Sequence, residues 1–185
     1  MKSLILLILL GISFSVTLHS NEYPIKYDIH FKKWSKYYLP TSDWKLLKSQ
    51  CIVESNLNPI AISPVGARGV CQFMPATFSD VERKLKVVGD PFDPRLNIQF
   101  AGYYMMNMQK FWNSNRPDVD RKNLAMASYN AGAGNLHKAQ KKCVGSILFS
   151  EIMQCLPCIT GHHHIETKNY VKRIRKTHYK LKIGY

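Results

Sequence analysis

The stretch that decides the fold runs from residue 54 to residue 77 and reads ESNLNPIAISPVGARGVCQFMPAT. Just before it, Trp44, Leu47 and Cys51 recur at helical spacing, so they share one face of a helix. Residues 41–43 supply N-cap candidates for this helix. Glu54 follows Cys51 by one turn and continues the same apolar face, which is an unusual place for a carboxylate.

Residues 56–59 include a proline and end this first helix. The next segment, residues 60–72, is rich in turn formers, namely Ser63, Pro64, Gly66 and Gly69. It predicts a compact loop or a short β-hairpin. Proline at position 75 then opens a second helix that runs to about residue 85.

The rest of the chain predicts further helices joined by irregular segments. A long helix begins at Asp93-Pro94, a short one covers residues 124–129, and a basic one covers residues 166–181. The apolar stripe of the long helix is Phe100, Tyr104, Met108 and Phe111. We expect residues 21–40 to form an extended lead-in, and we expect the stretch between residue 134 and residue 166 to be a linker.

The N-terminus predicts export. Lys2 precedes an apolar run from Leu4 to Leu10, which continues diluted to Leu18 and ends in small and polar residues near Ser20. This order is typical of a signal peptide over residues 1–20. The alternative is a retained membrane anchor, but the run is shorter than the roughly 20 residues that a spanning helix needs. We therefore expect a periplasmic or secreted protein.

The net charge of +14 comes from 26 basic and 12 acidic residues and favours a polyanionic partner. Many of the basic side chains lie in the last predicted helix. In an exported protein, anionic wall polymers or a membrane surface explain such a charge better than nucleic acid, so we expect no nucleic-acid partner. Membrane contact is expected only through the N-terminal segment or this basic helix.

Five cysteines are candidates for disulfides in an exported chain. Because the number is odd, at least one stays free or pairs with another chain. Cys143 could pair with Cys155 or with Cys158. The spacing of the latter two also matches a redox motif, although the supporting βαβ pattern is absent. Residues 162–164 are adjacent histidines that cannot all face one ion, so we expect no metal site.

Burial of Glu54 on an apolar face predicts one of two outcomes. A basic residue neutralises it, or desolvation raises its pKa so that it stays protonated near neutral pH. The protonated state is the one that a general acid needs to protonate a glycosidic oxygen. Position alone does not establish a catalytic role, because a glutamate at a helix end is more often solvated.

Four ordered blocks give the chain a family resemblance. They are residues 54–59, residues 63–77, residues 127–134 (ASYNAGAG) and residues 166–171 (ETKNYV). In order and spacing they resemble the soluble lytic transglycosylase family, over about residues 44–174. The resemblance implies a predominantly helical α+β, lysozyme-like domain over residues 41–185, with a small β-hairpin beside the catalytic helix.

The resemblance also implies roles for individual residues. Glu54 matches the family's sole catalytic residue, while Glu166 is expected to be structural. The positions that match substrate-binding residues are Ser63, Gln72, Met74, Tyr129, Asn130 and Tyr170, and the resemblance places Tyr170 near the catalytic carboxylate. No cofactor is implied. Cys71 departs from the family pattern, and a bridge from Cys71 to Cys51 would tie the helix to the hairpin, unless both are small core residues.

The implied activity is cleavage of the glycan strands of peptidoglycan between N-acetylmuramic acid and N-acetylglucosamine, leaving 1,6-anhydro ends. A secretion, conjugation or pilus apparatus is a further expected partner. The alternatives are a hydrolytic lysozyme-type enzyme and a non-catalytic glycan-binding component of an envelope-spanning machine or phage particle.

Overall fold

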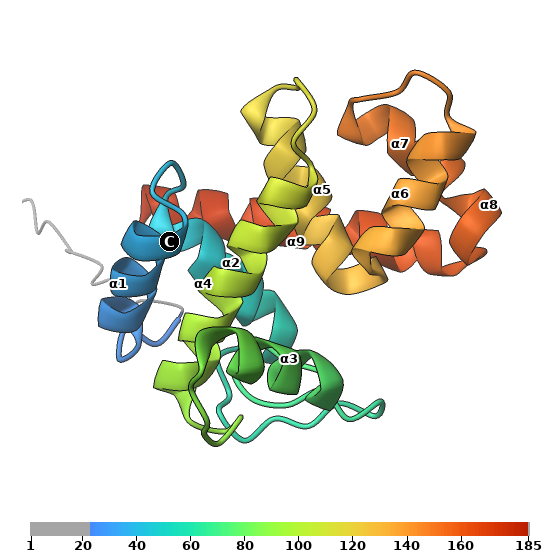
Figure 1. Cartoon of the computed structure of the whole chain (residues 1–185). Coiled ribbons are helices and arrows are strands. Elements are labelled where there is room, and N and C mark those ends of the chain that lie inside the picture. Colours follow the sequence, from blue (N-terminus) through green and yellow to red (C-terminus); the bar gives the residue numbers. More distant parts are fainter. Residues whose placement is uncertain (1–22, 185) are drawn as a thin grey trace, which may run out of the picture.

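The computed structural model describes residues 23–184, and this part of the chain is built from helices (Figure 1). The predicted signal peptide lies outside the described residues. Within them, no helix combines the length and the apolar character needed to cross a bilayer. The helices are α1 (Asp28–Tyr38), α2 (Trp44–Ser55), α3 (Pro75–Leu85), α4 (Pro94–Phe111), α5 (Asp118–Ala131), α6 (Ala133–Lys142), α7 (Phe149–Cys155), α8 (Pro157–Thr160) and α9 (His163–Ile183).

Helix α2 lies at the centre of the fold and carries Glu54 near its C-terminal end. It packs against α1 and α9, and α4 and α5 pack beside these three. The predicted N-cap is confirmed, because the Asp43 carboxylate accepts a hydrogen bond from the backbone N–H of Lys45. Leu47 and Cys51 are buried as their spacing predicts. The helix ends at Asn56, which adopts a left-handed conformation.

The expectation of an extended lead-in over residues 21–40 is wrong, because Asp28–Tyr38 forms helix α1. Phe31 and Ser35 are buried in the core, and Trp34 and Tyr38 are stacked at its edge. Lys48 of α2 is buried as well, and its ammonium group lies 2.6 Å from a carboxylate oxygen of Asp28. The helical periodicity of this segment is hard to see in the sequence, because lysines and tyrosines dilute the apolar face of the helix.

The predicted β-hairpin is also wrong. Over the described residues, the segment between α2 and α3 contains isolated antiparallel bridges, Ile62 with Arg68 and Arg68 with Phe73, and no strand. Turns hold most of this loop instead. Ser63 closes one of them by accepting a hydrogen bond from the backbone N–H of Ala67 and donating its own N–H to the carbonyl of Ala67.

Helices α3 and α4 begin at the prolines that predicted them, α9 covers the predicted basic helix and begins a few residues earlier, and α5 is longer than predicted. One member of the α4 stripe was wrong, because the Phe111 side chain is 46% exposed at the last turn. The linker prediction was wrong too. Helices α6, α7 and α8 fill this stretch and form a group at the side of the molecule away from α1 (Figure 1). A disulfide between Cys143 and Cys155 joins α6 to α7, and Cys158 is free and exposed.

Candidate active site

Glu54 has the properties predicted from its place on an apolar face. Burial raises the pKa of its carboxyl group from 4.5 to about 7, and a hydrogen bond from Tyr170 and the positive charge of Arg173 oppose that rise. Desolvation is the largest of these effects. The group can therefore hold a proton near neutral pH and can also lose it there.

Tyr170 is the direct partner of Glu54. Its hydroxyl donates a hydrogen bond of 2.5 Å to Oε1 of Glu54, across the interface between α9 and α2. Tyr170 is buried, and burial together with the nearby Glu54 carboxyl raises the pKa of its phenol well above the ordinary value. The phenol therefore remains a hydrogen-bond donor at neutral pH, and it fixes one carboxyl oxygen while Oε2 stays available.

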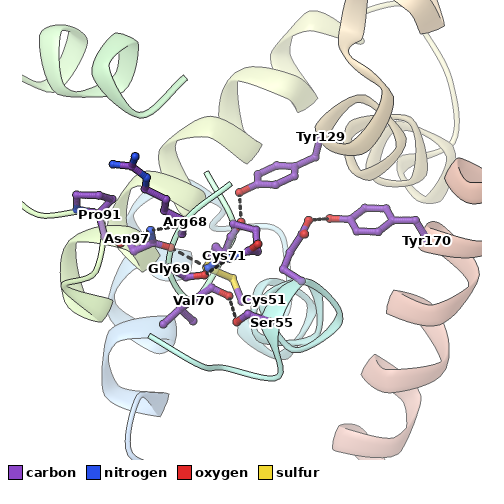
Figure 2. The surroundings of a disulfide bond; sticks show 12 residues. Cys51, Ser55, Arg68, Gly69, Val70, Cys71, Pro91, Asn97, Tyr129 and Tyr170 are labelled. Carbon is purple, nitrogen blue, oxygen red and sulfur yellow. Dashed lines mark hydrogen bonds between the residues drawn. A yellow bond between two sulfur atoms is a disulfide. The ribbon is translucent and has the colours of Figure 1, made fainter. Parts of the chain in front are cut away.

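A disulfide ties the loop to α2 one turn before Glu54. Cys51 of α2 is bonded to Cys71 of the loop, and both are fully buried (Figure 2). The carbonyl of Cys71 also accepts a hydrogen bond of 2.6 Å from the hydroxyl of Tyr129 on α5. The Ser55 hydroxyl donates to the carbonyl of Val70 at 2.6 Å. These links hold the loop against α5 and against the C-terminal end of α2, which carries Glu54.

Asn97, at the start of α4, holds the other side of this loop. Its Oδ1 accepts a hydrogen bond from the backbone N–H of Cys71 (2.8 Å), and its Nδ2 donates to the carbonyl of Pro91 (2.8 Å; Figure 2). Gly69 lies against this amide with φ +77°, and a Cβ there would come within 2.5 Å of Nδ2 of Asn97. The loop is thus built around a buried amide that only a glycine can approach so closely.

Two of the predicted sugar-contacting residues on the loop differ in their surroundings. The Gln72 side chain is held by hydrogen bonds, and the Met74 side chain is exposed. Gln72 has φ +52°, and its Nε2 donates to the carbonyls of Ala61 and Gly69 (3.1 and 2.9 Å), which leaves its Oε1 as an acceptor. Met74 is 43% exposed at the N-terminus of α3. Ser63 uses its hydroxyl oxygen within its own turn.

Asn130 lines a cavity of about 480 Å³ between α5, α6, α8 and the start of α9. Both ends of its amide already have partners. Nδ2 donates to Glu166 (3.0 Å), and Oδ1 accepts from the hydroxyl of Thr167 (2.9 Å). The structure therefore places Asn130 in a polar network with Glu166 and Thr167 of the ETKNYV block.

Sequence reasoning missed two residues that shape the site. Arg173 lies one turn after Tyr170, and its positive charge lowers the pKa of Glu54. The sequence does not distinguish it from the other basic residues of the last helix. Asn97 gave no signal, because its role depends on a loop almost 30 residues away. In the part of the chain that the structure describes, no group of three or more His, Cys, Asp or Glu is placed to hold a metal ion.

Residues 31–145, more than half of the chain, match the family model described as the transglycosylase SLT domain. The chain belongs to this family. The SLT domain model begins within α1 and ends after α6, so it includes Glu54, Gln72, Tyr129 and Asn130 but not Tyr170.

Relatives of this SLT domain are named as lytic murein transglycosylases. Membrane-bound lytic murein transglycosylase F of Pseudoalteromonas translucida is 33% identical over 60% of this chain and 22% of that protein. The enzyme of the same name from Serratia proteamaculans is 29% identical over 84% of this chain and 34% of that protein. The chain thus spans at most about a third of these relatives.

A solved structure confirms the fold. The 70 kDa soluble lytic transglycosylase SLT70 of Escherichia coli superposes with a TM-score of 0.69 at 25% identity, over 88% of this chain and 25% of that one. The same match holds for a complex of the 70 kDa soluble lytic transglycosylase with bulgecin A. The predicted lysozyme-like, predominantly helical fold is therefore confirmed, apart from the hairpin.

Proposed function

We propose that this chain is a peptidoglycan lytic transglycosylase in which Glu54 acts first as an acid and then as a base. The observation that carries the proposal is the state of that carboxyl group. It is desolvated, it has a pKa of about 7, and a neutral phenol holds it. A residue that must both give and take a proton works best when its pKa lies near the working pH.

In the first step, protonated Glu54 gives its proton to the oxygen that links C1 of N-acetylmuramic acid to C4 of N-acetylglucosamine. The C1–O bond breaks, and the acetamido group of the muramic acid stabilises the positive charge on its ring. In the second step, ionised Glu54 takes the proton of the C6 hydroxyl, whose oxygen bonds to C1. The product is a 1,6-anhydro sugar, no water is consumed, and Glu54 regains its proton.

The residues around Glu54 fit roles in positioning the sugars. Gln72 offers its Oε1 as an acceptor beside the disulfide, and Tyr170 orients the carboxyl group. Asn130, Met74 and Ser63 are proposed to contact the glycan at the edges of the site, Asn130 from the cavity that it lines. Tyr129 contributes through the Cys71 carbonyl, because its hydroxyl is already donated there.

A hydrolytic enzyme of the lysozyme type is the alternative. Such enzymes use a second carboxylate as well as the acid. Glu166 is the acidic residue whose charge acts on Glu54, but this is the smallest of the effects on its pKa, and the Glu166 carboxylate already accepts a hydrogen bond from Asn130. The arrangement therefore favours chemistry with one carboxylate.

The test is cleavage of purified peptidoglycan by wild type, Glu54→Gln and Glu166→Gln, with the products read by mass spectrometry. We expect 1,6-anhydro ends from wild type and a rate about 1,000-fold lower for Glu54→Gln. Glu166→Gln should still produce anhydro ends, even at a reduced rate. Reducing ends from wild type would show a hydrolase, and an active Glu54→Gln variant would refute the assignment of the acid.

We also propose that the protein works outside the cytoplasm, where its substrate lies. The N-terminal signal-like sequence supports this, as do the membrane-bound murein enzymes among its relatives. Local opening of the wall for a secretion, conjugation or pilus apparatus is the cellular role that we propose. Fractionation of cells that express the full chain, followed by pull-down from the envelope fraction, tests both parts.

A further inference from the structure

The outer face of α9 carries a regular stripe of exposed side chains. Its members follow one another at intervals of three or four residues, so they form a single line along the helix. They are Ile165, Lys168, Lys172, Lys176, Tyr179 and Ile183. At a rise of 1.5 Å per residue, the line is about 27 Å long. It lies opposite the buried face of the helix, which includes Tyr170 and Ile174.

The composition of the stripe is unusual for a solvated face. Ile165 is 52% exposed, Tyr179 is 64% exposed and Ile183 is 49% exposed, so apolar side chains stand at both ends of the lysines. None of Lys168, Lys172 and Lys176 has an ion pair or hydrogen bond within residues 23–184. No acidic residue belongs to the stripe, so nothing in it offsets the three charges.

We infer that this stripe binds the surface of an anionic phospholipid bilayer. A helix that lies in the membrane interface presents Lys and Arg together with apolar and aromatic side chains on one exposed face. The lysines would pair with phosphate headgroups while Ile165, Tyr179 and Ile183 enter the boundary with the acyl chains. Bare charge attracts any polyanion, but exposed isoleucines at both ends fit a lipid surface better than a hydrophilic wall polymer or a nucleic acid.

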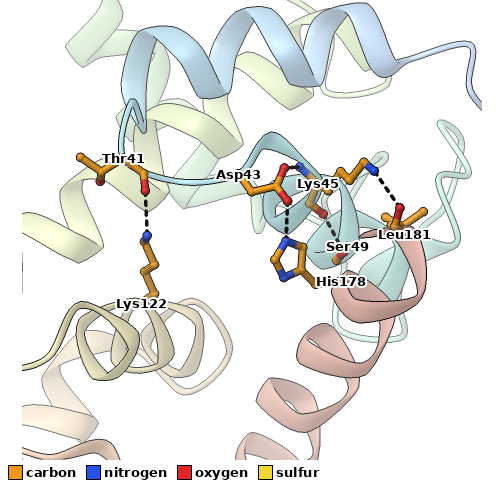
Figure 3. Close-up of polar contacts among 7 residues, drawn as sticks. All are labelled: Thr41, Asp43, Lys45, Ser49, Lys122, His178 and Leu181. Carbon is orange, nitrogen blue, oxygen red and sulfur yellow. Dashed lines mark hydrogen bonds and ion pairs between the residues drawn. The ribbon is translucent and has the colours of Figure 1, made fainter. Parts of the chain in front are cut away.

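The helix is held firmly enough to act as a preformed binding face. At its C-terminal end, the His178 imidazole contacts the Asp43 carboxylate (2.9 Å), and the Lys45 ammonium group donates to the carbonyl of Leu181 (2.8 Å; Figure 3). Both partners belong to the start of α2, so α9 is fixed to the central helix. Binding would therefore not require the helix to form or to detach.

Docking by this face would also orient the catalytic site. Tyr170 reaches Glu54 from the opposite side of α9. A bilayer against the stripe would thus leave the carboxyl group on the side of the molecule that faces away from the membrane. That orientation suits a polymeric substrate lying above the bilayer. The inference about lipid stands on α9 alone and does not depend on the proposed chemistry.

The test is co-sedimentation of the full chain with vesicles of phosphatidylcholine alone or with added phosphatidylglycerol. The variants are Lys168→Gln/Lys172→Gln/Lys176→Gln and Ile165→Ser/Ile183→Ser. The matched control, Lys138→Gln/Lys141→Gln/Lys142→Gln, removes the same charge from exposed lysines on α6. Wild type and all variants share the same N-terminal segment. Binding to vesicles of phosphatidylcholine alone measures what that segment contributes.

We expect wild type and the α6 control to bind the anionic vesicles alike, and the α9 triple variant to bind about 100-fold more weakly. The isoleucine variant should also lose affinity, and every variant should keep wild-type cleavage of peptidoglycan. Equal binding to both kinds of vesicle would overturn the inference, as would equal losses from the α6 and α9 variants. If the α9 triple variant bound isolated sacculi more weakly than wild type but bound vesicles as well as wild type, the stripe would be assigned to the wall instead of the membrane.

Discussion

Glu54 makes the folded protein less stable at neutral and alkaline pH, because its carboxyl group is desolvated. Its pKa is about 7 in the fold and 4.5 ordinarily, so between these values the folded state holds a proton that the unfolded chain has lost. Stability therefore falls as the pH rises from 4.5 to 7 and stays lower above it. We predict that Glu54→Gln is more stable than wild type at pH 8, by up to about 3 kcal/mol, and equally stable at pH 4. Urea denaturation at the two pH values measures this, and equal stability at pH 8 would contradict it.

Tyr170 tunes the same group in the opposite direction. Its hydroxyl stabilises the ionised carboxyl and so lowers the pKa of Glu54. We predict that Tyr170→Phe raises that pKa and moves the alkaline limb of the activity profile upward by roughly one pH unit. The phenyl ring preserves the burial, so thermal unfolding should show an intact fold. A rate that drops without any movement of the alkaline limb would mean that Tyr170 serves only packing.

At the scale of elements, the loop before α3 depends on one amide from α4. Asn97 is fully buried and bonds Cys71 and Pro91 of two different segments. We predict that Asn97→Ala costs about 3 kcal/mol of unfolding free energy, because it leaves buried backbone groups unpaired. Cleavage should fall as well, since the loop carries Gln72. The matched control is Asn107→Ala in the same helix, which should cost less than about 0.5 kcal/mol. Similar losses of unfolding free energy from both variants would show that the effect comes from helix propensity and not from the hydrogen bonds of Asn97.

The elements that the sequence predicted well are those with local signals. Asp43 and Asp93 cap α2 and α4 with their own carboxylates, and prolines open α3 and α4. Helices α1 and α6–α8 have no side-chain N-cap of Ser, Thr, Asp or Asn, and their apolar faces are diluted by charged or small residues. Glycine and proline mark turns in compact loops and in hairpins alike, so the sequence of this segment does not separate the two structures. Only the hydrogen bonds of Ser63 and Asn97 decide between them.

At the scale of the molecule, the site joins segments that are far apart in the chain. Glu54 comes from α2, Gln72 from the loop, Tyr129 from α5 and Tyr170 from α9. Helical spacing could place the first residue on a buried face, but it could not show that a phenol 116 residues away donates to it. The family resemblance supplied that pairing in outline. The bridge between Cys51 and Cys71 was left open, and the structure decides in its favour.

Helix α1 belongs to the core, which predicts that a change within it affects the whole molecule. Asp28 of α1 pairs with Lys48, which is buried on the central helix, and α1 packs against that helix. Asp28→Ala would leave an unpaired ammonium group in the core, and we predict a loss of about 3–5 kcal/mol. Replacing both partners, as Asp28→Ala/Lys48→Met, should recover most of that loss, because no buried charge remains. Urea denaturation of the three proteins measures it. If Asp28→Ala cost nothing, Lys48 would have reached solvent, and the ion pair between α1 and α2 would not stabilise the core.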